Sequence, residues 1–302
     1  MNSGWWLSFI RWFDSRAEIT GKGGKDQCNV DWVRCLPFFF LHIACLNVFW
    51  VGFSYTAFFL AGSLYFLRMF AITGFYHRYF SHRAFKTSRW VQLIFAIIGA
   101  SSAQRGPLWW AAHHRHHHRY SDSPEDIHSP VQSGFFWSHM FWFTNRSNFK
   151  TKSHLISDLN HFPELQWIDR FDIVIPVILG VHLFITGEIF QNYFPELETN
   201  GPQLLVWGII STVFLFHATC STNSIAHLFG TKRYKTGDSS RNNFWIALLT
   251  LGEGWHNNHH HYPSSVQQGF YWWEIDVTYW ILFIMSKLGL VWGLRLVPNK
   301  IK

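Results

Sequence analysis

Cysteine is scarce in this 302-residue sequence, and the few cysteines follow no pattern. Cys28, Cys35, Cys45 and Cys220 lie scattered without CxxC spacing, which argues against both an iron–sulfur cluster and a disulfide framework. The sequence also lacks a Gly-x-Gly-x-x-Gly dinucleotide fingerprint, internal repeats and low-complexity runs. It therefore carries neither an iron–sulfur nor a dinucleotide-binding motif.

Acidic residues are outnumbered, with 18 Asp and Glu against 25 Lys and Arg and a formal net charge of +7. A basic chain of this kind suits either an acidic protein partner or anionic lipid headgroups. Hydrophobic residues make up 48% and aromatic residues 20% of the sequence, an aromatic content typical of membrane interfaces. Stretches of about 20 apolar residues are long enough to cross a bilayer. We expect four such helices, over residues 36–53, 56–76, 173–190 and 204–224.

Histidine is abundant and clustered. On a helix, residues three and four apart share one face, so the triplet His114, His117 and His118 can converge on one point. The same spacing recurs in a second triplet: His256, His259 and His260.

A third pair, His77 and His82, is five residues apart, or about 140° apart on an α-helix. Both can face one metal only if the helix loosens or bends, which predicts a helix end near residues 79–81. Eight histidines are too many for one tetrahedral zinc, so two metals fit better. Asn223 and His227, four residues apart, add a ninth histidine and an amide.

The residues around these clusters resemble a known family. Segments 77–82 (HRYFSH), 134–139 (GFFWSH), 223–227 (NSIAH) and 252–260 (GEGWHNNHH) are similar to those of membrane-bound fatty acyl desaturases of the stearoyl-CoA (delta-9) type, in its bacterial form. The resemblance implies O2-dependent formation of a cis double bond in a long-chain acyl substrate at two iron ions. It places the iron ligands at His77, His82, His114, His117, His118, His227, His256, His259 and His260, with Asn223 reaching iron through water.

The expected fold is all-α and integral to the membrane, with residues 1–302 forming a single domain. A cytoplasmic helical cap, residues 77–170 and 228–302, would hold the histidine-rich diiron site. Two spans separate the first clusters from the last, so all clusters lie on one side, together with both termini. Lys and Arg crowd that side, whereas the loop at 191–203 has none, which predicts a cytoplasmic site at a bacterial inner membrane.

The sequence departs from the family in one region. Animal acyl-CoA enzymes carry an Arg-Asp pair before the second cluster that helps hold CoA, and Ala112-His113 stands there; a later basic pair is reduced to Arg146-Ser147. The acyl carrier therefore stays open between CoA and a membrane lipid. Electrons must come from an external carrier such as a ferredoxin or a cytochrome with its reductase, and no nucleic acid partner is expected.

Several other polar residues lie near the clusters. Glu253, Asp122, Glu125 and Asp126 are candidates to hydrogen-bond the ligand histidines. Arg68, inside the second span, either reaches the cytoplasmic boundary or pairs within the helix bundle.

The sequence also gives expectations for three further sets of residues: histidines outside the motifs, residues lining an acyl tunnel, and two short helices. His113, His116 and His261 fall off the pattern and are read as non-ligands. Candidates for the wall of an acyl tunnel are Trp109, Trp110, Trp255 and residues 135–137. Residues 91–103 and 277–294 are expected to form short buried or interfacial helices.

Three other functions remain open at this stage. A hydroxylase or acetylenase on the same scaffold shares the first hydrogen abstraction, so the motifs barely separate it from a desaturase. A membrane transporter with a structural metal and a bis-histidine haem protein belong to different classes. About four spans, with every cluster on one side, argue against the transporter.

Overall fold

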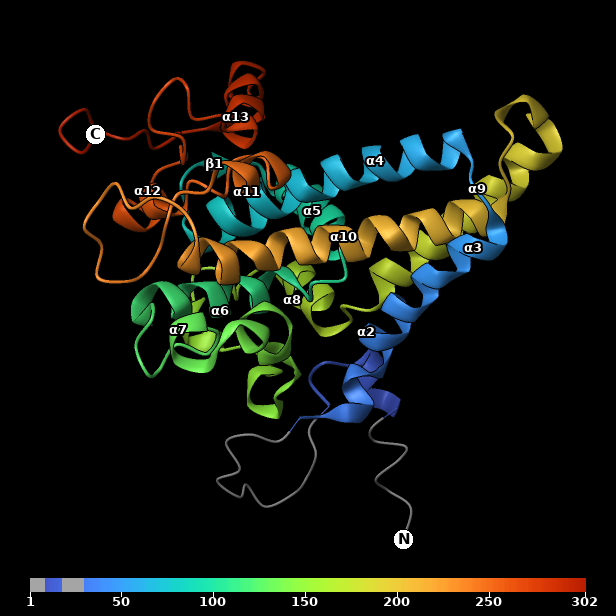
Figure 1. Cartoon of the computed structure of the whole chain (residues 1–302), viewed down its shortest axis with the longest axis horizontal. Coiled ribbons are helices and arrows are strands. Elements are labelled where there is room, and N and C mark those ends of the chain that lie inside the picture. The colour runs from blue at the N-terminus through green and yellow to red at the C-terminus, as the bar shows by residue number, and fades with distance from the viewer. Residues whose placement is uncertain (1–8, 18–29) are drawn as a thin grey trace, which may run out of the picture.

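The computed structural model describes residues 9–17 and 30–302, and almost all regular structure there is helical (Figure 1). Four helices in this part of the chain are long and apolar enough to cross a membrane: Trp32–Val51, Tyr55–Ser81, Val174–Tyr193 and Gly201–His227. The strands β1 (Lys86–Thr87) and β2 (Val291–Trp292) form a small antiparallel pair. The prediction of an all-α membrane protein is confirmed.

The first two long helices are each composed of more than one element, whereas the third and the fourth are each one element. They are α2 (Trp32–Ala44), η1 (Cys45–Asn47) and α3 (Val48–Val51) in the first, α4 (Tyr55–Phe70) and η2 (Ala71–Ser81) in the second, α9 (Val174–Tyr193) in the third and α10 (Gly201–Leu228) in the fourth. The side chain of Ser54 accepts a hydrogen bond from the backbone N–H of Ala57, and Asn200 forms a capping box with Gln203. These caps satisfy backbone donors that a helix start leaves unpaired.

The second and fourth helices extend beyond the apolar stretches in the sequence. The second runs past residue 76 to Ser81, and α10 runs past residue 224 to Leu228. The added turns carry His77 and His227, whose polar side chains do not belong to the apolar stretches used to predict the helices. Most side chains in these turns are buried, so packing rather than lipid maintains the helix there.

The remaining helices gather at one end of the molecule, around η2 and the last turns of α10 (Figure 1). We call this group the helical cap. Its elements are α5 (Arg89–Ala100), α6 (Pro107–Tyr120), α7 (Pro130–Ser133), η3 (Trp137–Phe141), η4 (Trp142–Thr144), η5 (Arg146–Asn148), η6 (Ser153–Leu155), α8 (Pro163–Arg170), α11 (Phe244–Leu249), α12 (His256–His261) and α13 (Val277–Lys287). A short 3-10 turn at the opposite end, η7 (Pro195–Leu197), connects α9 to α10.

The helix expected over residues 277–294 is shorter than predicted. It ends at Lys287, and Gly289, with a φ of 73°, turns the chain into β2. Only glycine adopts such a φ without steric cost, so this turn is a natural helix stop. The helix expected over 91–103 forms as α5, displaced slightly toward the N-terminus.

Arg68 lies within the helix bundle, with 1% of its surface exposed. It donates hydrogen bonds to Ser211 Oγ at 2.8 Å and Thr212 Oγ1 at 2.6 Å on α10. Of the two expectations for Arg68, the structure shows the one in which the side chain pairs inside the helix bundle. Hydroxyl and carbonyl oxygens, rather than a carboxylate, satisfy the guanidinium.

Candidate metal centre

The five-residue spacing of His77 and His82 is explained by the local helix type. Residues 71–81 form a π-helix, in which hydrogen bonds join residues five apart, and the backbone N–H of His82 donates to the carbonyl of His77 at 3.2 Å. This wider turn places the two rings on one side, with their centroids 4.9 Å apart. The predicted loosening and the helix end near residue 81 are both confirmed.

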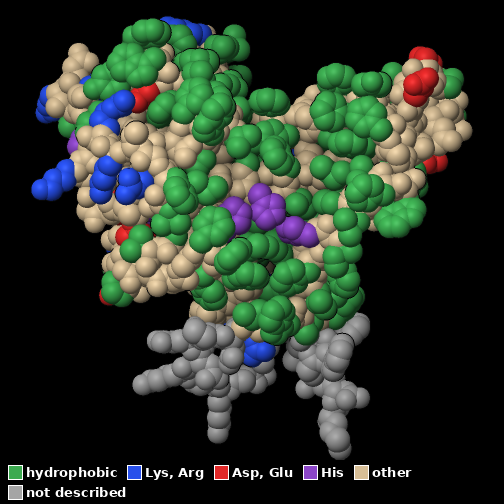
Figure 2. All heavy atoms as spheres, viewed as in Figure 1, with side chains coloured by type: hydrophobic (Ala, Val, Ile, Leu, Met, Phe, Trp, Pro, Cys, Tyr) green, Lys and Arg blue, Asp and Glu red, His purple; other side chains and the backbone are tan. Residues whose placement is uncertain are grey.

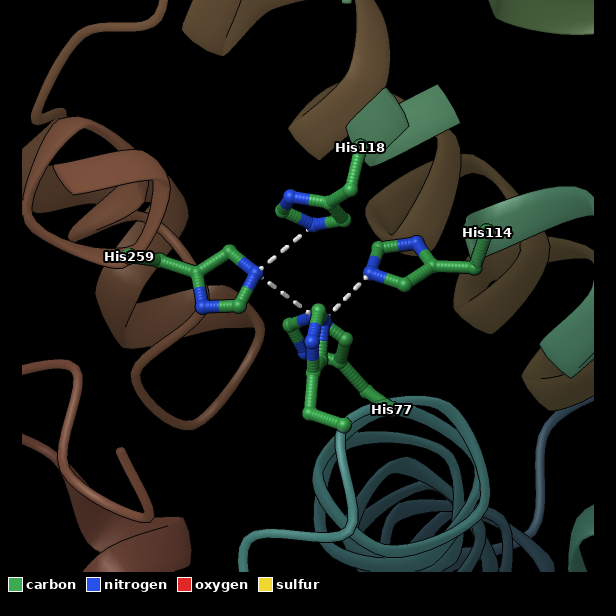
Figure 3. A group of neighbouring side chains, drawn as sticks. His77, His114, His118 and His259 are labelled. Atoms are coloured by element: carbon green, nitrogen blue, oxygen red, sulfur yellow. Dashed lines mark hydrogen bonds between the residues drawn. The ribbon is translucent and has the colours of Figure 1, made fainter. Parts of the chain in front are cut away.

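Five histidines from three elements converge into a first group: His77, His82, His114, His118 and His259. One nitrogen of each lies within 4.8 Å of the others. The Nε2 atoms of His77 and His118 are 3.0 and 2.9 Å from that of His259, and Nε2 of His82 is 2.8 Å from that of His114. Figure 3 shows the rings of His77, His114, His118 and His259 pointing toward a common point from η2, α6 and α12.

A second group contains His117, His227, His256 and His260. Nε2 of His227 lies 3.0 Å from Nε2 of His256. Nε2 of His117 and of His260 is buried without a hydrogen-bond partner. A buried nitrogen left without a partner costs free energy unless a ligand satisfies it, so these atoms fit a bound metal.

The two groups contain all nine histidines singled out in the sequence, but the expectation that each triplet converges on one point is wrong. His117 lies in the second group, apart from His114 and His118, and His259 lies in the first group, apart from His256 and His260. His113, His116 and His261 belong to neither group. Nδ1 of His113 is 2.9 Å from the carbonyl of Trp109, and His261 stacks on Tyr234 with ring centroids 4.1 Å apart.

Carboxylates orient four of the grouped rings through Nδ1. Asp126 lies 2.9 Å from Nδ1 of His117, Asp122 lies 3.1 Å from Nδ1 of His227, and Glu253 contacts Nδ1 of His77. Such pairs leave Nε2 free to bind a metal. Glu125, which the sequence also suggested, contacts only Ser123 and its own loop, because its side chain is exposed.

Two functional residues were missed in the sequence. Asp238 lies 2.5 Å from Nδ1 of His260, although 22 positions separate them and no motif surrounds it. His128 is buried against His117, with ring centroids 4.4 Å apart and Nδ1 3.7 Å from Asp126. Only the folded chain brings these side chains to the centre.

The environment keeps most of the grouped imidazoles neutral. Burial, followed by the charges of neighbouring histidines, holds the pKa of His82, His114, His118, His256 and His259 well below the usual value. Neutral imidazole is the form that binds a metal. These five rings are therefore ready to act as ligands at neutral pH.

The pKa values of the histidines that pair with carboxylates reflect burial and carboxylate charge to different degrees. Burial lowers the pKa of His260 to about 4 even though Asp238 opposes it. Burial also disfavours charge on His117, but Asp126 outweighs it, so the pKa of His117 is raised. The partners hold the pKa of Asp126 and Asp238 well below the usual range, so both carboxylates are ionised at neutral pH.

The donor set fits two transition-metal ions. Five imidazoles in one group and four in the other exceed what a single tetrahedral ion takes, and imidazole suits iron, zinc, copper and nickel. Asn223 lies on α10 one turn before His227, and its side chain lines the cavity beside the histidines. The geometry thus provides two neighbouring histidine groups, each of which could hold a metal ion.

A cavity of about 430 Å³ leads from this centre into the protein. Its wall is largely apolar and is formed by residues from α2, α4, α6, η4 and α10, including Phe38, Met69, Trp109, Trp110 and Phe216. Of the predicted wall residues, Trp109 and Trp110 line the cavity. Trp255 and residues 135–137 do not.

Several polar side chains also line the cavity. His77, His114 and His256 mark the metal end. Arg34, at the start of α2, and Arg105, just before α6, also line the cavity, and Arg105 is paired with Asp172. About 10 Å of helix separates the first residue of α6 from His114, since each residue adds ~1.5 Å. The cavity therefore suits a long apolar molecule with a polar end.

The sequence model of the fatty acid desaturase family matches residues 50–283. Over 282 residues, the chain is 34% identical to an sn-1 stearoyl-lipid 9-desaturase of Anabaena variabilis, covering 90% of this chain and 96% of that protein. It is 37% identical over 248 residues to a probable chloroplast lipid desaturase of Arabidopsis thaliana, covering 81% of this chain and 65% of that protein. An acyl-CoA 5-desaturase of Anemone leveillei is 34% identical over 266 residues, covering 86% and 78% respectively.

Proposed function

Because this chain belongs to the fatty acid desaturase family, and is thus an oxidoreductase, we propose that it introduces a cis double bond of the delta-9 type into a long-chain acyl group of a membrane lipid. The observation that carries this proposal is the apolar cavity that ends at two converging histidine groups. Each turnover would remove two hydrogens from adjacent methylenes. With two electrons, two protons and one O2, these hydrogens leave as two molecules of water.

We assign the nine grouped histidines as ligands of two iron ions, with Asn223 contributing through a water molecule. The irons, when bound, supply the oxidising power that no side chain has. The chain itself holds the rings in place. Asp122, Asp126, Asp238 and Glu253 fix four of them by hydrogen bonds or ion pairs to Nδ1, which also sets the tautomer.

The protein also positions the acyl chain. An apolar wall excludes water and holds one pair of carbons beside the metal ligands. This positioning is the main contribution of the fold to the reaction. Trp110 is placed for this role, because its ring stacks on His114 with centroids 5.0 Å apart. The polar end of the substrate would lie with Arg34 and Arg105.

Two observations favour a lipid over CoA as the acyl carrier. Ala112 and His113 replace the Arg-Asp pair that helps hold CoA in animal relatives, and both side chains are buried. The Anabaena and Arabidopsis relatives are named as lipid desaturases, although the Anemone relative is named for acyl-CoA.

We place the helical cap and the C-terminus in the cytoplasm at a bacterial inner membrane. Lys and Arg side chains gather at the cap end in Figure 2, while acidic side chains mark the opposite tip. That tip contains Glu196 and Glu198, both exposed. The asymmetry agrees with the excess of positive charge found on cytoplasmic loops. The expectation for the N-terminus concerns residues 1–8, outside the described residues.

Product analysis tests the proposal. The wild-type chain, a His118→Ala variant and a His116→Ala control are each expressed in an aerated bacterium with a competent reductase, and double bonds in total lipids are mapped by mass spectrometry. His116 lies on the same helix but outside both groups. We expect a delta-9 product from the wild type and the control, and none from His118→Ala, which should also lose iron.

Other products would change the assignment. Hydroxylated or acetylenic acids would favour the oxygenase alternative, and one zinc per chain without turnover would favour a non-enzymatic role. Full activity of His118→Ala would refute the ligand assignment.

A further inference from the structure

The loop between α10 and α11, residues 229–243, joins the metal centre to the surface. On its inner side, Asp238 hydrogen-bonds His260, and the backbone N–H of Ser239 donates to Asp122 at 2.7 Å. Asp122 in turn lies 3.1 Å from Nδ1 of His227. Two histidines of the second group, His227 and His260, are thus held through a single loop.

The same loop is fastened directly to the helix that carries three grouped histidines. The backbone N–H groups of Arg233 and Tyr234 donate to Oδ1 of Asn257, at 2.8 and 2.7 Å. Asn257 follows His256 in α12 and is fully buried. These hydrogen bonds fix the loop relative to the grouped histidines. A partner on its outer side therefore sits at a defined position relative to them.

The outer side of the loop is basic and aromatic. Lys232, Arg233, Lys235 and His261 are exposed around Tyr234, and we call these five residues the basic patch. Arg233 pairs with Glu274, whereas neither lysine has an ion-pair partner among the residues that the structure describes. Lys232 donates a hydrogen bond to the backbone carbonyl of Asp238, which leaves its charge unneutralised, so both lysines present positive charge to a partner.

An aromatic pair connects the basic patch to the centre. Tyr234 and His261 are stacked with an interplanar angle of 4°, and His261 is the residue after His260. Trp272 is 88% exposed and follows Tyr271 in the chain. The hydroxyls of Tyr271 and Tyr234 both donate to the carbonyl of Lys302. Exposed aromatic and arginine side chains in one patch are typical of protein interfaces.

The position of the basic patch keeps it outside the hydrocarbon core of the bilayer. The helix α10 has 28 residues and is about 42 Å long at ~1.5 Å per residue, whereas the hydrocarbon core is about 30 Å thick. The loop follows the end of α10 that carries His227, opposite the tip at η7 (Figure 1). A bilayer that covers the η7 end of α10 leaves the loop well outside the hydrocarbon core.

We propose that the basic patch is the docking surface for an acidic one-electron carrier protein, whose electrons reach the metal centre through the 229–243 loop and His260. This inference rests on the proposed function, which requires a reductant. The carrier is oxidised by one electron in each of two successive encounters, and the two electrons contribute to reducing one O2 per double bond formed. Complementary charge would speed each encounter.

Binding measurements test the docking surface directly. The probe is a plant-type [2Fe–2S] ferredoxin, and the full chain is held in nanodiscs of uncharged phosphatidylcholine. The patch variant is Lys232→Glu/Lys235→Glu. The control, Lys86→Glu/Lys287→Glu, makes the same change in net charge at two exposed lysines on β1 and α13.

We expect the patch variant to raise the Kd for ferredoxin about tenfold at low salt, and the control by less than about twofold. The difference should shrink at high ionic strength, because salt screens exposed charges. In stopped-flow measurements on iron-loaded protein, reduction by ferredoxin should slow in the patch variant. Reduction by dithionite, which needs no docking, should not change.

Several results would overturn the proposal. Equal losses in both variants would indicate a general charge effect, and loss of binding to anionic vesicles with unchanged ferredoxin binding would indicate a lipid contact. A wild-type chain that binds neither ferredoxin nor a soluble cytochrome b5 domain would also refute it. If the patch variant makes unsaturated products and binds the donor normally, only the docking surface is refuted. If the wild type makes no unsaturated products, the proposed function is refuted.

Discussion

Single carboxylates orient some of the imidazole rings that face the metal positions, whereas packing orients the others. Four of the nine grouped histidines have such a partner, and in each case the contact is made at Nδ1. The other five depend on packing and on each other. Their low pKa values, caused first by burial, keep them neutral without a hydrogen-bonded anion.

Replacing Asp238 tests this role at the scale of one residue. In Asp238→Asn the charge that stabilises the Nδ1–H form of His260 is lost, and we expect metal affinity to fall about 10- to 100-fold. Iron retained after dialysis against graded chelator measures the change. Glu125→Gln, an acid-to-amide change at an exposed residue that touches no histidine, is the control. Equal retention in both variants would contradict the positioning role.

At the scale of elements, the π-helix η2 depends on α5. The ring of Tyr76 lies directly over Gly99, where an added Cβ would come within 2.2 Å of the ring carbon Cε1. Tyr76 also donates a hydrogen bond to the carbonyl of Ala96 at 3.0 Å. A glycine at this contact lets η2 pack closely enough to hold the neighbouring His77.

We therefore expect Gly99→Ala to destabilise the protein by about 1–3 kcal/mol through overpacking. Thermal unfolding of the detergent-solubilised chain measures this. The control is Gly62→Ala in α4, where an added Cβ meets nothing within 4 Å. That variant should change stability by at most about 1 kcal/mol. A Gly99→Ala protein as stable as the control would show that η2 tolerates displacement from α5.

At the scale of the whole molecule, the arrangement of the four long helices predicts opposite exposure of its two ends. A Glu196→Cys variant should react with a membrane-impermeant maleimide on intact cells. A Lys235→Cys variant should react only after the membrane is opened. Both positions are exposed in the structure, so access depends on the membrane alone. Labelling of Lys235→Cys on intact cells would contradict a cytoplasmic metal centre.

Much of the site was predictable because its determinants are local. The spacings 114, 117, 118 and 256, 259, 260 place side chains on one helix face whatever the rest of the chain does. The five-residue step from His77 to His82 required a loosened helix, and the chain forms a π-helix there. Apolar stretches similarly indicated the long helices, because length and composition are what a bilayer selects.

The tertiary structure decided what depends on contacts between distant segments. The division of nine histidines into groups of five and four separates His117 from its neighbour His118, which no spacing predicts. Asp238 and His128 reach the centre only because loops fold back over α6 and α12. Arg68 finds hydroxyl partners on α10 that lie 143 and 144 residues away in the chain. Helical periodicity acts over a few residues, whereas burial and ring orientation depend on packing between elements, which the spacing of residues does not encode.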